Sequence, residues 1–380
     1  MITTDFQLRQ LAKLIEQVDQ ISFDLEADSL RSYPERICLI QICIEDRGEF
    51  LVDTLAPINI RPLLEAFSKV ELIVHGSDYD LRLLRRAYDY SPRDIFDTQE
   101  AARLVGCRRF GLGALTEQYL NIELDKKHQR ADWTKRPLSE ELRTYARMDA
   151  RVLFPLSRLL RTELQSTGRS EWHRQNCQRL IDDARREKRD DRSSAWRIKG
   201  CSKLTRVGLG ALRELWRWRE EEALKANRPP FFILDHDRLI QIAERAAQNQ
   251  EFDDILPRRF PIRRRRSLDS ACARAKRLEA DELPEKRAPA VYVPRPQTER
   301  ERDALEDWKS KRDEVATDLD IDPTVIANKA TLEAMAVDES EASLSLLPWQ
   351  ADLLGARQRE HRRNGSSHSQ DLNREISAEI

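Results

Sequence analysis

The sequence lacks the features of a membrane-spanning or secreted protein. No apolar run approaches the roughly 20 residues needed to cross a bilayer, and residues 1–9 carry no apolar signal core. The cysteines form no CxxC pair and no cluster with histidines at the spacing of zinc ligands. Scattered cysteines of this kind are typical of a reducing compartment. We therefore expect a cytoplasmic protein with no membrane partner.

A dominant charge of one sign is also missing. The 66 Lys and Arg residues nearly balance the 67 Asp and Glu residues, which gives a formal net charge of -1. The chain as a whole is therefore no polycation, and any nucleic-acid surface must be a local patch offset by acidic surface elsewhere. No long heptad stripe is present, which favours a monomer. The length of 380 residues exceeds one ordinary core and predicts two or three domains.

Strand and helix patterns alternate only in the first part of the chain. Short apolar runs predict strands at residues 20–26, 37–44, 49–52 and 71–74. Apolar spacing predicts helices at residues 7–18, 61–67, 81–88, 100–105, 112–119 and 139–164. The last helix has Ser139 as a plausible N-cap, and Pro155 should kink or divide it. These elements predict a mixed-sheet α/β domain over residues 1–170.

After residue 200 the strand signals nearly vanish, and the pattern predicts two small all-α domains that repeat one another. A shift of 93 positions matches helix and turn residues without a gap: Arg219 with Arg312, Ala223 with Ala316, Pro230 with Pro323, Ile233 with Ile326, Leu239 with Leu332 and Ala243 with Ala336. We expect a charged helical linker at 171–199, helical domains at 200–283 and 298–360, an extended Pro-rich link at 284–297, and a polar disordered tail at 361–380.

Three short segments carry acidic residues that point to metal chemistry. Asp24 and Glu26 lie two positions apart on a predicted strand and would project from one face. Asp78 and Asp80 follow a buried strand and a Gly-Ser turn. Asp78 suits an N-cap, so we select Asp80 as the functional residue. For each segment alone, a surface strand with chance acidic residues or plain helix capping is an adequate alternative.

The third segment places Tyr145 and Asp149 on one helix face, since they are four residues apart. A hydrogen-bonded pair on a helix surface is the structural alternative. Considered together, Asp24, Glu26, Asp80 and Asp149 form a carboxylate set suited to two divalent cations, either Mg²⁺ or Mn²⁺. Such a cation pair serves in-line phosphoryl transfer. Tyr145 would orient the attacking water.

These segments resemble the three exonuclease motifs of the DEDD superfamily, in its tyrosine-bearing branch. The segment His-Gly-Ser-Asp-Tyr-Asp-Leu at 75–81 is similar to the second motif of the ribonuclease D family, and residues 125–138 resemble the stretch that precedes the third motif there. The repeated modules look like the HRDC domains of that family. The second departs more, with Trp308 where the first has Leu215 and without the double proline.

The resemblance implies a ribonuclease-H-like exonuclease fold followed by two HRDC-type domains. It also implies two bound metal ions and 3′→5′ hydrolysis of RNA to nucleoside 5′-monophosphates, notably at the 3′ ends of tRNA precursors. Six residues are candidate RNA contacts: Lys126, Gln129, Trp133, Arg136, Arg219 and Arg264. Burial as a core anchor is the alternative for Trp133.

Two other functions are compatible with the same motifs. The substrate could be DNA, although no helicase motif such as a Walker A run accompanies the exonuclease motifs. The chain could also be a nucleic-acid-binding protein whose exonuclease domain is inactive, against which the complete set of four carboxylates and a tyrosine argues.

Overall fold

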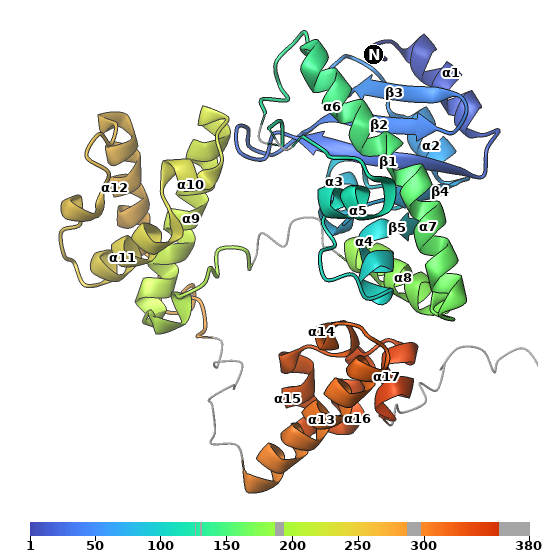
Figure 1. Cartoon of the computed structure of the whole chain (residues 1–380). Coiled ribbons are helices and arrows are strands. Elements are labelled where there is room, and N and C mark those ends of the chain that lie inside the picture. The colour runs from blue at the N-terminus through green and yellow to red at the C-terminus, as the bar shows by residue number, and fades with distance from the viewer. Residues whose placement is uncertain (126, 130, 187–193, 287–297, 357–380) are drawn as a thin grey trace, which may run out of the picture. The chain divides into compact units, whose positions relative to one another are not determined.

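The computed structural model describes residues 1–125, 127–129, 131–186, 194–286 and 298–356, and the chain divides into two compact units, Met1–Pro296 and Gln297–Ile380 (Figure 1). The predicted tail at 361–380, most of the Pro-rich link at 284–297, part of the linker at 171–199 and Lys126 lie outside the described residues. Among the described helices, none is long and apolar enough to cross a bilayer.

A five-stranded mixed sheet forms the centre of the N-terminal part, in the order β3-β2-β1-β4-β5. The strands are β1 (Gln20–Ala27), β2 (Ile37–Ile44), β3 (Gly48–Asp53), β4 (Glu71–Val74) and β5 (Ile95–Asp97). Strands β1, β2 and β3 pair antiparallel, whereas β4 pairs parallel with both β1 and β5. The sequence missed β5, because its three residues are too short to show a period.

Helices cover both faces of this sheet (Figure 1). On one face the core gathers residues of α1 (Asp5–Ile15), α2 (Arg61–Phe67), α3 (Asp78–Tyr88) and α8 (Ser170–Arg186). On the other face α6 (Glu140–Arg151) packs across β1, β2 and β3, and α7 (Leu153–Ser166) packs on β1 and β4. The helices α4 (Thr98–Leu104) and α5 (Leu112–Leu120) pack on α7. This arrangement confirms the predicted α/β fold class.

The predicted helix at 139–164 is divided, as its proline suggested, but not at the proline. Ser139 caps α6 through its hydroxyl, and the break falls at Val152. Pro155 lies in the first turn of α7, where the missing N–H costs nothing because it would have no partner within the helix. The break lets α6 end directly after Asp149 and Ala150, both of which are buried.

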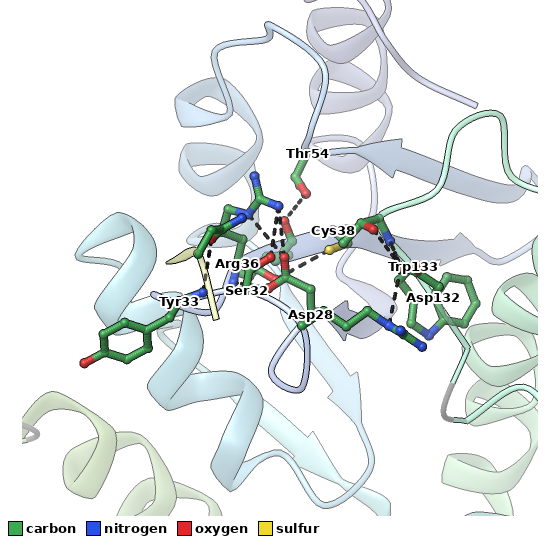
Figure 2. A network of polar contacts seen from close by, with 12 residues as sticks. Asp28, Ser32, Tyr33, Arg36, Cys38, Thr54, Asp132 and Trp133 are labelled. Carbon is green, nitrogen blue, oxygen red and sulfur yellow. Dashed lines mark hydrogen bonds and ion pairs between the residues drawn. The ribbon is translucent and has the colours of Figure 1, made fainter. Parts of the chain in front are cut away.

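The connection between β1 and β2 is held by a buried carboxylate (Figure 2). Asp28, whose side chain is fully buried, accepts hydrogen bonds from the Arg36 backbone N–H at 2.7 Å and from the Arg36 guanidinium at 3.0 and 3.2 Å. Arg31 in the same loop forms an ion pair with Asp132 at 3.5 Å. The loop that follows Glu26 is thereby fixed to the segment that leads into α6.

Arg136 fixes that same segment to the sheet. Its guanidinium donates two hydrogen bonds of 2.6 Å to the Asp53 carboxylate at the end of β3. The remaining N–H groups reach the backbone carbonyls of Trp133, Lys135 and Cys38 at 2.8–2.9 Å. An arginine with all its donors used inside the protein acts as a strut. The sequence had offered it as an RNA contact, a prediction that this geometry does not favour.

Two helical modules follow, and the 93-residue repeat is visible in their structure. The first contains α9 (Arg206–Ala226), α10 (Pro230–Ile233), α11 (His236–Ala247) and α12 (Ile262–Lys276). The second contains α13 (Glu299–Asp318), α14 (Pro323–Ile326), α15 (Lys329–Val337), α16 (Glu339–Ala342) and α17 (Pro348–Leu354). Short 3₁₀ turns lie at Cys201–Lys203, Asp253–Ile255 and Ser343–Ser345.

One hydrogen bond recurs at the same shift of 93 positions. Arg219 donates to the carbonyl of Leu234 at 3.4 Å, and Arg312 donates to the carbonyl of Ala327 at 3.2 Å. In each module the arginine on the long helix closes the turn that ends the short proline-led helix. The repeated arginine therefore has a structural reason in both copies. This contact and 3% exposure do not favour the predicted RNA contact of Arg219.

The Arg136 strut generates a stability prediction. Arg136→Ala should lower the free energy of unfolding by about 2–4 kcal/mol, because it leaves the Asp53 carboxylate, whose side chain is 7% exposed, without its charged partner. Urea denaturation monitored by circular dichroism would measure it. Arg158→Ala is the control, since Arg158 is 63% exposed and pairs with Glu45 on the surface. It should cost under about 1 kcal/mol. Equal losses in the two variants would contradict the strut.

Candidate active site

Strand β1 presents two carboxylates on the face that α6 covers. Phe23 and Leu25 are buried in the core on the opposite face, so Asp24 and Glu26 project together toward α6. Ser22 lies on the same face as Asp24 and donates its hydroxyl to the carbonyl of Ala150 at 2.7 Å. This buried bond ties the strand of Asp24 to the end of α6, where Asp149 lies.

Helix α6 contributes Asp149 and Tyr145 from successive turns. Carboxylate oxygens of Asp24, Glu26 and Asp149 all lie within 4.8 Å of one another, a separation that a shared cation could bridge. The phenol of Tyr145 lies close enough to Asp149 that burial and then the charge of Asp149 raise its pKa above the ordinary value. Its ring packs at 6.1 Å from that of Trp133 and at 5.7 Å from that of His128. The tyrosine is therefore held beside the carboxylates from two sides.

Asp80 completes the group from the first turn of α3. It is not among the three residues whose oxygens lie within 4.8 Å of one another. Burial raises its pKa well above the ordinary value, with repulsion from Asp24 adding to the shift, and its own charge contributes to the raised pKa of Glu26. Asp78, the alternative in the sequence, instead pairs with Arg82 at 2.9 Å and its side chain is 53% exposed. The backbone thus turns Asp80 toward the cluster and Asp78 toward solvent.

Burial raises the pKa of every carboxyl group of this cluster, and repulsion between carboxylates adds to the shift at Asp24, Glu26 and Asp80. Burial raises the pKa of Asp24 to about 7, with repulsion from Asp149 adding to it. Burial and repulsion from Asp24, Asp149 and Asp80 raise the pKa of Glu26 to about 10, and burial raises that of Asp149 to about 6. Bound divalent cations would remove the repulsion, and hard cations prefer carboxylate oxygens. The residues therefore fit a metal centre.

Comparison with known proteins supports the same assignment. Residues 1–165 match the model of the 3′-5′ exonuclease family, and residues 208–251 match the HRDC domain. The ribonuclease D of Desulfotalea psychrophila is 27% identical over 338 residues, which cover 88% of this chain and 89% of that protein. The ribonuclease D of Zymomonas mobilis is 29% identical, with 93% and 92% covered. The chain is similar to ribonuclease D along nearly its whole length.

A solved structure extends the likeness to the fold. The crystal structure of Escherichia coli RNase D aligns with a TM-score of 0.75 at 23% identity, over 93% of this chain and 96% of that one. The exonuclease match and the ribonuclease D relatives support 3′→5′ exoribonuclease activity, and exonucleases of this superfamily depend on divalent metal ions, in agreement with the carboxylate cluster.

The sequence missed one residue that positions the second motif. Asp97 is fully buried at the end of β5. One of its oxygens accepts from the N–H groups of Gly76, Gln99 and Glu100 at 2.9–3.3 Å. The other accepts from the N–H and hydroxyl of Ser77, both at 2.8 Å. Asp97 therefore caps α4 and also clamps the turn that begins α3. An Asp before the helix at 98–104 was the available signal.

The remaining predicted RNA contacts have different surroundings. Gln129 is exposed, whereas Trp133 is 2% exposed and packs beneath Tyr145, the core position that the sequence held as its alternative. The side chain of Arg264 is 25% exposed and lies 3.5 Å from the carboxylate of Glu222. Other arginines around it are exposed: Arg258, Arg259, Arg263 and Arg266. These four side chains, unlike that of Arg264, are exposed to solvent.

Asp97 should affect metal binding as well as folding. Asp97→Asn keeps one acceptor oxygen but loses the second. The Ser77 N–H, in the turn before Asp80, then loses its acceptor, and the turn is no longer held by Asp97. We expect stability to fall by about 1–3 kcal/mol and the Mg²⁺ concentration for half-maximal activity to rise. Asp235→Asn is the matched control, because Asp235 caps α11 through a 2.9 Å bond to the Arg238 N–H, and Asn caps equally well. An unchanged Mg²⁺ midpoint in Asp97→Asn would limit its role to folding.

The raised pKa values predict how the metal-free protein responds to pH. Folding favours protonated Asp24, whose pKa is raised from 3.8 to about 7. That contribution is full below pH 4 and is lost as the pH rises through 7. In EDTA, Asp24→Asn should therefore gain Tm relative to wild type as the pH rises from 5 to 8. Mn²⁺ or Mg²⁺ should raise the Tm of wild type at pH 8 and close the gap.

Taking the difference between the two proteins removes the contributions of His75 and His173, whose pKa values burial lowers and which oppose the trend. Thermal shift assays in matched buffers would make the measurement. A Tm difference that stays constant between pH 5 and pH 8 would show that the cluster carries no repulsion.

Proposed function

We propose that Asp24, Glu26, Asp80 and Asp149 hold two divalent cations, Mg²⁺ or Mn²⁺, at the 3′ end of an RNA strand, and that Tyr145 orients the attacking water. The observation that carries this proposal is the convergence of three carboxylates from β1 and α6 within 4.8 Å, with Asp80 beside them on α3. When bound, the cations would supply an activated water and charge stabilisation for the phosphoryl group.

The protein groups have separate tasks in this hydrolysis. Water adds to phosphorus as the bond to the 3′ oxygen of the preceding nucleotide breaks, and that oxygen takes up a proton. In this arrangement Tyr145 would donate its O–H to the neighbouring Asp149 carboxylate, and its oxygen would accept a hydrogen bond from the water. Burial, followed by the charge of Asp149, raises the pKa of Tyr145 above its ordinary value, and the phenol stays protonated. It therefore orients the nucleophile rather than removing its proton.

RNA binding away from the catalytic centre is assigned to the helical modules. The exposed arginines named above lie before and within α12, and we propose that they contact the phosphates of a structured RNA body. The second module, with the repeated arginine contact, is proposed as a second HRDC-like domain. The family resemblance favours tRNA precursors as the natural substrates.

A degradation assay with paired variants tests the catalytic assignment. Single-stranded RNA labelled at its 5′ end should shorten stepwise with Mg²⁺ or Mn²⁺ and remain intact in EDTA. Asp80→Asn should reduce the rate at least about 10³-fold, since cations and their ligands contribute several kcal/mol to such a reaction. Tyr145→Phe should reduce it roughly 10²-fold. Asp78→Asn changes the solvent-facing neighbour of Asp80 and should leave the rate within about 2-fold.

The assay also separates the competing functions. A DNA strand of the same sequence degraded faster than RNA would reassign the substrate. Metal-independent binding without cleavage would indicate an inactive nucleic-acid-binding protein. Equal losses in Asp78→Asn and Asp80→Asn would remove the basis for choosing Asp80.

A further inference from the structure

A buried amide without a partner lies in the strand next to the catalytic one. Every residue of β2 is buried, and Gln41 is its one strongly polar side chain. The side chain is 0% exposed, and within the described residues neither its amide nitrogen nor its amide oxygen has a hydrogen-bond partner. Buried polar groups are almost always paired, and an unpaired one lowers stability. A function for this amide would account for its retention.

The strand register places Gln41 directly beside the catalytic cluster. It lies opposite Asp24 of β1 on one side and opposite Leu51 of β3 on the other. Side chains that are directly opposite in an antiparallel pair share one face and lie close together. On its own strand the neighbours on that face are Leu39 and Cys43. Asp24 is thus the nearest carboxylate by register, and the other adjacent side chains are weakly polar or apolar.

Helix α6 closes the remaining side. It packs on β2, and its buried residues are Ala146, Asp149 and Ala150 (Figure 1). Alanine side chains offer Gln41 no polar atom. Ser22, which is diagonal to Gln41 on the same face, donates its hydroxyl to Ala150 instead. Asp24, directly opposite in the register, is therefore the carboxylate best placed to accept a hydrogen bond from the amide.

We propose that Gln41 is a positioning residue for Asp24, whose carboxylate accepts a hydrogen bond from the Gln41 amide N–H when the cations are bound. The inference rests on the metal site proposed above. A carboxylate that ligates a cation through one lone pair keeps others free, and a neighbouring donor fixes its orientation. Gln41 would thus gain in the metal-loaded enzyme a partner that the described residues do not otherwise offer its amide N–H.

Substitution by an apolar side chain of similar length separates this role from packing. Gln41→Met removes both polar atoms while filling nearly the same volume. In EDTA its Tm should equal or exceed that of wild type, because an unpaired amide has been removed. Its dissociation constant for Mn²⁺, measured by isothermal titration calorimetry, should rise about 10- to 100-fold.

Leu39→Met is the matched control. Leu39 lies on the same strand and face, opposite Glu26, and belongs to the same buried layer. It receives the same new side chain without loss of a polar group, so its affinity for Mn²⁺ should stay within about 2-fold of wild type.

Two results would overturn the proposal. One is an Mn²⁺ affinity of Gln41→Met equal to that of Leu39→Met. The other is a lower Tm of Gln41→Met in EDTA than that of Leu39→Met, which would mean that the amide has a partner before metal binds. A wild-type protein that binds no Mn²⁺ would instead refute the metal site itself, and the inference with it.

Discussion

Mutual repulsion among four carboxylates is the constraint on which the rest of this structure depends. Asp24, Glu26, Asp80 and Asp149 come from three elements and meet where burial weakens their hydration. Left to themselves, such groups would move apart or stay protonated. The fold therefore needs rigid connections between the strand β1 and the helices α3 and α6, and it places buried or partly buried hydrogen bonds at these connections.

Those connections share a logic. Ser22 ties β1 to the end of α6, Asp97 clamps the turn that begins α3, and Arg136 fixes the segment that leads into α6. None of them needs to touch a substrate. Each uses a side-chain group to satisfy backbone N–H or C=O groups at the end of an element, where such groups lack partners within their own helix or strand. The proposed catalytic carboxylates lie near these ends, so the bonds that complete the backbone also set the positions of the carboxylates.

The sequence predicted the catalytic elements well because their signals are local. A D-x-E pair on an apolar strand, and a Tyr and an Asp four residues apart on a helix, fix their own faces through the backbone period. The sequence predicted the residues around this site less well. Arg136 donates hydrogen bonds to Asp53 and to three backbone carbonyls, whereas Arg263 is exposed. The residue type alone does not distinguish these two arginines. Whether an arginine can contact RNA or instead bonds within the protein depends on neighbours that are distant in the chain.

Gln41 is a residue that the sequence could locate but not interpret. One amide within the apolar run at 37–44 was visible in the sequence, yet its meaning required the register that sets it opposite Asp24. A buried strand usually excludes such a residue, since an apolar side chain would pack there without loss. The amide and the crowded carboxylates are both unfavourable in the metal-free protein, and they lie on adjacent strands of one sheet. A bound cation would reduce the repulsion among the carboxylates and keep Asp24 ionised as an acceptor for the amide. Both features that lower the stability of the protein without metal would then increase its affinity for the metal.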